Sequence, residues 1–210
     1  MIETTWLGKR SYASVQQLQE SQRKLVLQDI NNEKMFILEH EHVITTGKRS
    51  VDLTAIPSNI QIVRSNRGGL ATYHGPGQLI VYPIIHIKKR GIRIRAWVYT
   101  LEQAVINLLR QFNITATRKC SHPGVWVADN KICSVGLHIQ HGVSIHGIAV
   151  NLQSNLSYFT YIEPCGINSA QICSLHQLYS GPINIKEIGL ELAKEIHNCL
   201  QKFDVVPRIN

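Results

Sequence analysis

Cys165 and Lys131 carry the side-chain types that could act as a nucleophile and move a proton. Cys165 lies between Pro164 and Gly166, so we expect it on a turn and not within a helix or a regular strand. A cysteine on a turn is more accessible than one in a core, and its thiolate is the nucleophilic form. Among the five cysteines, Cys165 is therefore the best candidate for a nucleophile.

Lys131 follows a predicted hairpin turn at 129–130 and opens a β-rich run. Most lysines at such a place are solvated, whereas a catalytic lysine needs partial burial that lowers its pKa. The residue pattern leaves both interpretations open. Cys133 and Cys199 are expected to be structural, because Cys133 alternates with its neighbours in a strand and Cys199 fits the apolar stripe of a helix.

A glycine-rich segment, 66–78, is predicted to be a shaped loop, since four glycines and a proline cannot sustain a helix. Its spacing matches neither a Walker loop nor a dinucleotide fingerprint. A tight surface loop is one interpretation. The other is a ligand-binding loop, which is favoured by the polar side chains of Arg67, Tyr73, His74 and Gln78.

These residues must be positioned by helices set among hairpin-like strands. Apolar spacing predicts helices over 12–29, 96–112 and 185–203. Strands are predicted over 35–38, 60–64, 79–87, 124–127, 131–139 and 143–152, and Pro83 indicates an edge strand or a bulge. Because strict strand–helix alternation is missing, we expect a single α+β domain over residues 1–210 with a largely antiparallel or mixed sheet.

The composition narrows the class of protein. No apolar run reaches the roughly 18 residues of a membrane span and no leader is recognisable, so we expect a cytoplasmic protein without a membrane partner. The odd number of cysteines argues against a disulfide framework. Histidine and cysteine pairs form no zinc pattern, so we expect no metal and no cofactor. The net charge of +8 fits a generally basic surface or an acidic partner, and charge alone does not separate an acidic protein from a nucleic acid. No zinc-finger, RRM or KH signature occurs, so we expect no nucleic-acid partner.

Four ordered segments resemble the lipoyl(octanoyl) transferase family, whose members are octanoyl-[acyl-carrier-protein]:protein N-octanoyltransferases. They cover roughly residues 39–167: the loop 67–79, the segments 124–127 and 131–136, the block 146–152 and the block 164–167. The resemblance implies a fold shared with biotin and lipoate protein ligases, in which a curved mixed sheet is flanked by helices. Departures from the family pattern fall at Cys133, at Asn155 and at the pair 41–42.

The resemblance also implies roles for single residues. Cys165 would carry the acyl group as a thioester, and Lys131 would lower the pKa of its thiol. The acyl substrate would be bound by Arg67, Gly68, Gly69, Leu70, Ala71, Thr72, Tyr73, His74, Ser134, Val135, Gly136, Gly147, Ile148 and Ala149. The donor would be octanoyl-acyl-carrier protein. The acceptors would be lysines in the lipoyl domains of 2-oxoacid dehydrogenases and in the glycine cleavage H protein.

Three other functions fit parts of the sequence. An ATP-dependent lipoate or biotin protein ligase would share the fold but would not require Cys165. A non-catalytic module that binds acylated carriers would keep the cavity without the chemistry. A nucleic-acid binder is suggested by charge alone, and its binding would be sensitive to salt.

Overall fold

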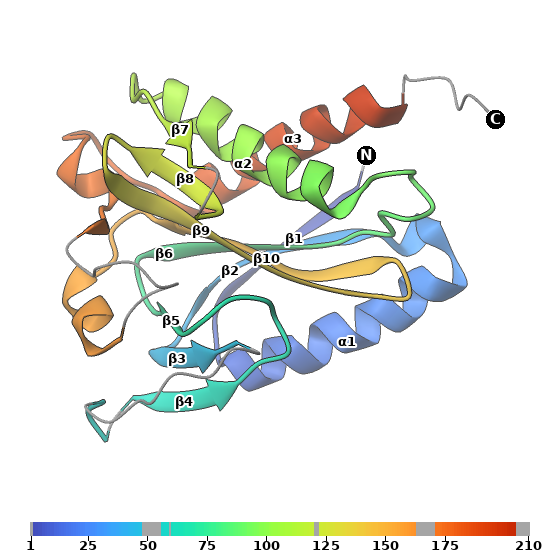
Figure 1. Cartoon of the computed structure of the whole chain (residues 1–210), viewed down its shortest axis with the longest axis horizontal. Coiled ribbons are helices and arrows are strands. Elements are labelled where there is room, and N and C mark those ends of the chain that lie inside the picture. Colours follow the sequence, from blue (N-terminus) through green and yellow to red (C-terminus); the bar gives the residue numbers. More distant parts are fainter. Residues whose placement is uncertain (1, 48–55, 59, 120–121, 163–170, 205–210) are drawn as a thin grey trace.

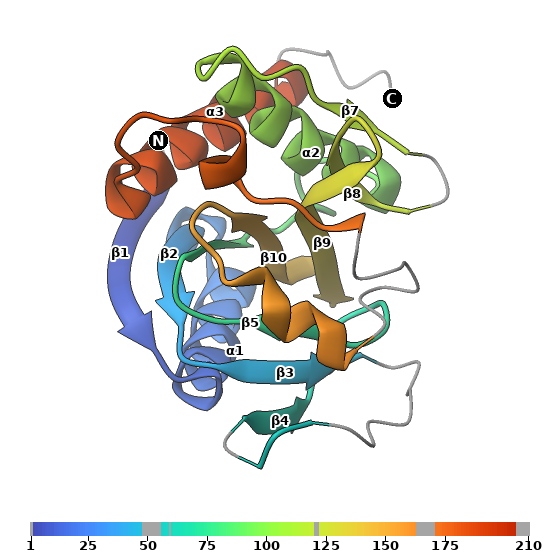
Figure 2. The ribbon, with the colours of Figure 1, turned by 90° about the vertical axis from the view of Figure 1, so that its left-hand side faces the viewer.

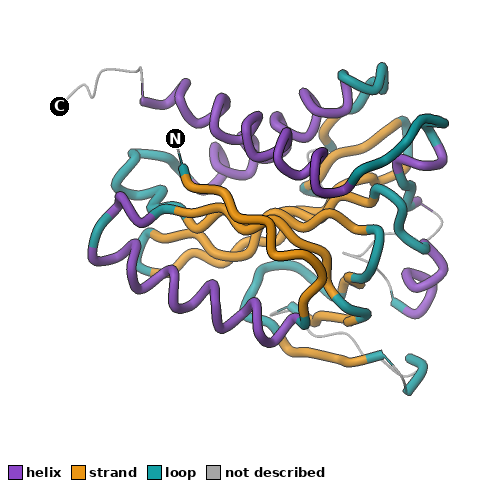
Figure 3. Tube along the Cα trace, turned by 180° about the vertical axis from the view of Figure 1, so that it is seen from behind, coloured by secondary structure: helices purple, strands orange, loops and turns teal. Residues whose placement is uncertain are grey.

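The computed structural model describes residues 2–47, 56–58, 60–119, 122–162 and 171–204. Within these ranges a seven-stranded sheet crosses the molecule, with one helix layer on each face (Figures 1 and 3). Its strand order is β1 (Glu3–Arg10), β2 (Lys34–His40), β6 (Gln78–Ile84), β10 (Val143–Asn151), β9 (Asn130–Gln140), β8 (Gly124–Val127) and β7 (Thr117–Arg118). The β1–β2 pair is parallel and the other pairs are antiparallel, so the predicted mixed sheet and α+β class are confirmed.

A smaller sheet lies beside the first one and carries part of the glycine-rich loop (Figure 2). Its strand order is β4 (Gln61–Arg64), β3 (Val43–Thr46) and β5 (Thr72–His74). The short 3₁₀ helices are η1 (Ile30–Asn32), η2 (Leu156–Tyr161) and η5 (Leu175–Gln177). Both η2 and η5 follow β10 in the chain.

Three α-helices of the described ranges cover the large sheet, and their positions agree with the predicted ranges. Helix α1 (Tyr12–Gln28) lies on one face, and α2 (Ile94–Arg110) and α3 (Ile185–Asp204) lie together on the other (Figure 1). Ser11 caps α1 by accepting a hydrogen bond from the Ser14 amide. No helix in the described ranges has the length and apolar character needed to cross a bilayer.

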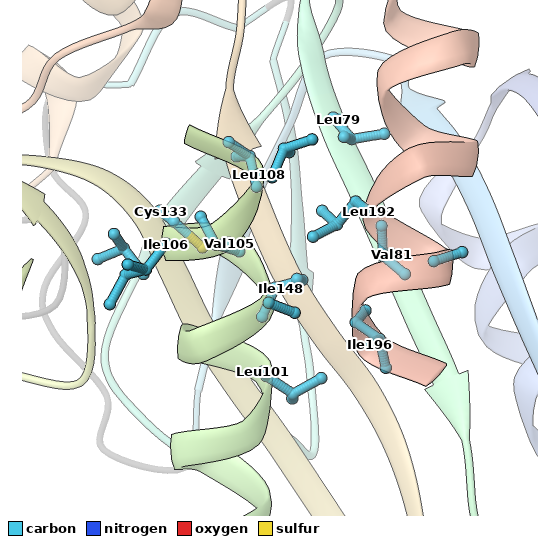
Figure 4. Packing of buried hydrophobic residues seen from close by; sticks show 14 of the residues in the cluster. Leu79, Val81, Leu101, Val105, Ile106, Leu108, Cys133, Ile148, Leu192 and Ile196 are labelled. Atoms are coloured by element: carbon cyan, nitrogen blue, oxygen red, sulfur yellow. The ribbon is translucent and has the colours of Figure 1, made fainter. Parts of the chain in front are cut away.

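The larger core cluster fills the space between the sheet and the α2–α3 layer. Side chains from both helices meet side chains from the central strands there, among them Leu101, Val105, Leu192, Val81 and Ile148 (Figure 4). This packing fixes β9 and β10, which carry several predicted site residues, against a rigid support. A second cluster lies under α1 on the opposite face of the sheet.

Pro83 does not mark an edge, because β6 is an interior strand between β2 and β10. The alternative, a bulge, is not found either, because the β6–β10 register is the same on both sides of Pro83. Val81 pairs with Ile148 and Ile85 bridges Ser144, so the β6–β10 ladder lapses between them, around Pro83. A proline has no N–H to donate to a neighbouring strand. Because the β6–β10 pairing is interrupted around Pro83, no donor is required there.

Candidate active site

Lys131 is buried, with 2% of its surface exposed, at the start of β9. Its Nζ lies 5.5 Å from the centroid of the Trp126 ring on the neighbouring strand. Gly124 leaves room for it, because a Cβ at that position would lie 2.5 Å from Lys131 Cε. The interpretation of Lys131 as a solvated strand-edge lysine is therefore wrong, and its aliphatic stem and ammonium are enclosed by protein.

A carboxylate lies within electrostatic range of Lys131. Burial raises the pKa of Glu102, while its hydrogen bond from the Gly124 amide and the charges of Arg118 and Lys131 act to lower that pKa. The Gly124 amide donates to Glu102 Oε1 at 2.7 Å, and Arg118 Nε lies 3.2 Å from Oε2. Glu102 thus neutralises part of the positive charge behind the lysine.

Residues 172 and 173 are hydrogen-bonded to the backbone of Lys131. Ile172 forms a parallel bridge with Lys131, and the Cys173 amide donates to the Lys131 carbonyl at 3.0 Å. Asn151 Nδ2 donates to the Cys173 carbonyl at 3.1 Å, which secures the same segment to β10. Cys165 itself lies outside the described residues.

A cavity of about 270 Å³, which we call the lysine cavity, has Lys131 in its wall. One side is formed by the glycine-rich loop and the other by alternate apolar residues of β9, Val135, Leu137 and Ile139. The full lining is Gly68, Gly69, Leu70, Ile94, Val98, His122, Pro123, Lys131, Val135, Gly136, Leu137 and Ile139. A mostly apolar cavity with one ammonium in its wall suits an aliphatic chain that carries a reacting carbonyl.

A second, much smaller cavity, which we call the histidine cavity, shares Val135 and Gly136 with the first. Its volume is about 30 Å³. Its lining is Tyr12, Arg67, Thr72, His74, Tyr82, Ser134, Val135, Gly136, His146, Gly147, Ile148 and Ala149. The two cavities therefore share a wall at Val135 and Gly136, beside the Arg67 side chain.

Arg67 holds the glycine-rich loop in shape. Its guanidinium donates to the carbonyls of Gly68 and Leu70 at 3.0 and 2.8 Å, and to the carbonyl of Thr45 at 2.7 Å. It also donates twice to Thr45 Oγ1. These bonds connect the loop to β3, so that a segment rich in glycine keeps one conformation beside the cavities.

His74 is buried and held in one tautomer. Its Nδ1–H donates to Gln78 Oε1 at 2.7 Å, and Gln78 Nε2 donates to Asn151 Oδ1 at 2.9 Å. Burial and the nearby His40 keep the pKa of His74 well below its usual value. His74 is therefore neutral at physiological pH, with the lone pair of Nε2 available to accept a hydrogen bond.

His146 adopts a strained backbone conformation within β10, with φ of 58°. Its amide donates to Gln19 Oε1 and its Nε2–H donates to Asn66 Oδ1, both at 2.7 Å. Burial, with help from Arg67, lowers the pKa of His146 to about 3. In the described part of the chain Nδ1 is buried and has no hydrogen-bond partner. The constant β6–β10 register places His146 opposite Pro83, so the strain falls where the ladder lapses.

The described cysteines are buried and protonated. Burial raises the pKa of Cys133 to about 12 and that of Cys173 to about 11, and it also raises the pKa of Cys199. The structural roles expected for Cys133 and Cys199 agree with this burial. Among described residues, no group of three histidine, cysteine or acidic side chains could hold a metal ion.

Most of the residues predicted to bind substrate come together at the two cavities. Ala71 and Tyr73 do not, since both belong to a separate apolar cluster, where Tyr73 stacks on Tyr158 with ring centroids 4.8 Å apart. The sequence analysis did not single out Tyr12, Tyr82, Ile94, Val98, His122, Pro123, His146, Leu137 or Ile139 as lining residues. Apolar alternation along β9 is a signal that could have identified Leu137 and Ile139.

The fold and the site define a class of catalytic domain. The family described as the lipoyl protein ligase A/B catalytic domain matches residues 11–197. The chain belongs to this family, as the sequence segments predicted.

Its relatives in this family narrow the class. An octanoyltransferase from Pelobacter propionicus is 34% identical over 94% of both chains. An octanoyltransferase from Alkaliphilus metalliredigens is 37% identical over 85% of both chains, and one from Shewanella pealeana is 38% identical over 90% of this chain and 86% of its own. The protein is accordingly an enzyme of the acyltransferase class.

Solved structures share the fold at low sequence identity. Lipoate-protein ligase A bound with ATP has a TM-score of 0.74 at 15% identity, covering 95% of this chain and 85% of that chain. Biotin protein ligase from Aquifex aeolicus has a TM-score of 0.57 at 16% identity, covering 96% of this chain and 70% of that chain. The expected relation to both kinds of ligase is therefore confirmed for the fold.

Proposed function

We propose that this enzyme transfers an octanoyl group from octanoyl-acyl-carrier protein to a specific lysine of lipoyl domains, through a thioester on Cys165. The octanoyltransferase relatives support the acyl group. A structural neighbour from Thermoplasma acidophilum, described as a bipartite lipoate protein ligase and its E2 lipoyl domain, supports the acceptor. The observation that carries the proposal is the buried Lys131 in the wall of an apolar cavity, bound through its backbone to residues 172 and 173.

In the first half-reaction, the Cys165 thiolate attacks the carbonyl carbon of the donor thioester. A bond from that carbon to Cys165 Sγ forms, and the bond to the carrier's thiol sulfur breaks. The Lys131 ammonium gives its proton to the departing thiolate, so the carrier leaves as a thiol. One thioester replaces another, and therefore no nucleotide is consumed.

In the second half-reaction, the amine of the acceptor lysine attacks the Cys165 thioester. A carbon–nitrogen bond forms, the bond to Sγ breaks, and neutral Lys131 accepts a proton from the attacking amine. The thiolate and the ammonium are thereby restored. An amide is more stable than a thioester, so this step drives the transfer forward.

The octanoyl chain is proposed to start beside Lys131 and to run along the apolar side of β9 to the junction at Val135 and Gly136. Burial of its methylene and methyl groups contributes about 0.8 kcal/mol each, which gives an upper bound of about 5–6 kcal/mol. That free energy is sufficient to favour an eight-carbon chain over much shorter ones.

The test is intact-mass measurement after incubation with octanoyl-acyl-carrier protein in the absence of any nucleotide. We expect one octanoyl addition, mapped by peptide mass spectrometry to Cys165 and absent in Cys165→Ser. Transfer that requires ATP would indicate a ligase instead. No acyl addition and no transfer, with intact carrier binding, would indicate a binding module.

A further inference from the structure

The lysine cavity reaches the surface beside a cluster of exposed residues at the start of α2. Ile94 lines the cavity and is 57% exposed, and Arg93 and Arg95 on either side of it are also exposed. Lys88 is exposed in the preceding turn. We call Lys88, Arg93, Ile94, Arg95 and Tyr99 the α2 surface. From residue 88 to residue 101 the sequence contains no acidic residue, so this surface is strongly positive.

Several residues of this surface destabilise the first turn of α2. The N-cap is Arg93, which makes no side-chain capping bond, and the first turn of α2 has no acidic residue. Arginines at this end repel the positive end of the helix dipole. Ile94 and Tyr99, exposed by 57% and 55%, leave apolar surface in water. Residues that disfavour the local structure are expected where a function requires them.

Tyr99 is held in place by Arg118, whose guanidinium lies 3.7 Å from the centroid of the tyrosine ring. Arg118 is itself oriented by the Glu102 carboxylate. The next residue, Lys119, lies 4.4 Å from the centroid of Trp126, the same ring that Lys131 approaches from inside. Positive groups therefore extend from the α2 surface towards the catalytic lysine.

We propose that the α2 surface docks the acidic protein that carries the acyl donor, so that the acyl group enters the lysine cavity past Ile94. This inference rests on the proposed function. Charge complementarity favours an acidic partner, and it speeds association more than it tightens binding. A nucleic acid would also be attracted by charge. The exposed Ile94 and Tyr99 favour a protein, because apolar and aromatic residues at the centre of a charged surface are typical of protein interfaces.

The test compares two donors, purified octanoyl-acyl-carrier protein and the small thioester octanoyl-pantetheine, in single-turnover acylation of the enzyme. The variant is R93E/R95E. The control is K9E/K24E, which changes the charge equally at two exposed lysines of β1 and α1 (Figure 1). We expect the variant to lower the second-order rate constant for acylation by the carrier roughly tenfold or more at low ionic strength. The effect should shrink as salt is added. Acylation by octanoyl-pantetheine should stay within about twofold of wild type, and the control should resemble wild type with both donors.

Three results of the acylation assay would overturn the docking surface. These are an unchanged rate with the carrier, an equal loss with both donors, and an equal loss in the K9E/K24E control. Transfer from enzyme acylated beforehand with octanoyl-pantetheine to the acceptor domain separates the two half-reactions, and a loss confined to that step would also overturn it. Binding of labelled carrier, followed by fluorescence anisotropy, tests docking without turnover. If carrier binding depends on Arg93 and Arg95 but no acyl group is transferred, the proposed function fails and the docking surface stands.

Discussion

Lys131 is buried, lines a cavity, and lies near the ring of Trp126, which Lys119 also contacts. A buried ammonium costs free energy unless it has a partner. In the described part of the chain no hydrogen bond or ion pair to its Nζ is found, although Glu102 lies within electrostatic range. The position is therefore better suited to proton transfer than to stability.

Replacement of Lys131 by methionine should separate these two properties. Lys131→Met keeps the apolar stem and removes the charge, so we expect the transfer rate to fall about 10³-fold. The free energy of unfolding should stay unchanged or rise by about 1 kcal/mol, since a buried charge is lost. Steady-state transfer and urea unfolding are the measurements. A variant that is both inactive and strongly destabilised would contradict this account.

Gly136 controls the junction of the two cavities. A Cβ there would lie 3.2 Å from Arg67 Cδ, and five hydrogen bonds prevent Arg67 from moving aside. Gly136→Ala should therefore shorten the acyl slot by about one methylene, which lowers the octanoyl-to-hexanoyl ratio of kcat/KM roughly fourfold.

The control for Gly136 is Gly8→Ala, where an added Cβ meets no atom within 4 Å but a φ of 68° strains the backbone, so it shows the effect of strain away from the cavities. Competition between octanoyl and hexanoyl carriers gives the ratio directly. An unchanged preference in Gly136→Ala would mean that the chain does not reach the junction.

At the level of single residues, the sequence could identify most of the site. Gly68 and His74 stand in a segment whose glycines and proline exclude a helix, and both line a cavity, although His74 belongs to the short strand β5. The burial of Lys131 could not be derived, because it depends on Gly124 and Trp126 from another strand. Ala71 and Tyr73 were predicted to bind substrate but lie in a separate apolar cluster. The sequence could not show this, because neighbouring residues of a loop can point in different directions.

At the scale of elements, the site depends on how β10 anchors the chain beside Lys131. Asn151, the last residue of β10, accepts from Gln78 and donates to the Cys173 carbonyl. Cys173 in turn donates to the carbonyl of Lys131. The three α-helices and the central strands followed from apolar periodicity in the sequence, whereas β1, β5 and β7 were not predicted. The contacts of Asn151 and Cys173 join residues far apart in the chain and could not be predicted either.

Removal of the Asn151 side chain should loosen this anchor. Asn151→Ala leaves the Cys173 carbonyl without its side-chain donor and the Gln78 amide with only a 3.4 Å bond to the Tyr73 carbonyl, so we expect a loss of about 2–3 kcal/mol in the free energy of unfolding. The acylation rate per folded molecule should fall as well, because residues 171–173 no longer hold their place beside the lysine.

Asn107→Ala is the matched control for Asn151. Asn107 also makes side-chain hydrogen bonds, to Glu195 and Cys199, but these join α2 to α3 away from the cavities. It should lower stability and leave the acylation rate per folded molecule unchanged. If the acylation rate per folded molecule is the same in Asn151→Ala and Asn107→Ala, Asn151 has only a structural role.

At the scale of the whole molecule, the buried histidines predict how stability depends on pH. Burial lowers the pKa of His40 to about 4 and that of His146 to about 3, and it keeps the pKa of His74 well below its usual value. Unfolded histidines bind protons near pH 6.5, whereas these folded ones do not. The unfolded state therefore gains protons first as the pH falls, and the folded state loses stability.

We expect the free energy of unfolding to be highest above pH 6.5 and to fall between pH 6.5 and 4. Each of these histidines contributes about 2 kcal/mol of the loss between pH 7 and pH 5. Urea unfolding at both pH values measures it, and His40→Gln should remove about one histidine's share. A stability that does not change over this range would mean that the imidazoles are not buried in their neutral form.

The arrangement of two lysines about Trp126 provides an optical signal. Trp6 is half-buried and Trp97 lies in the core, bound to Ser144, so neither is placed to sense the cavity. The indole of Trp126 is approached by one ammonium at the surface and another inside the cavity wall. Any molecule that moves or neutralises the inner ammonium alters the electric field at that ring. Tryptophan emission could therefore follow each acylation event in real time, without a label.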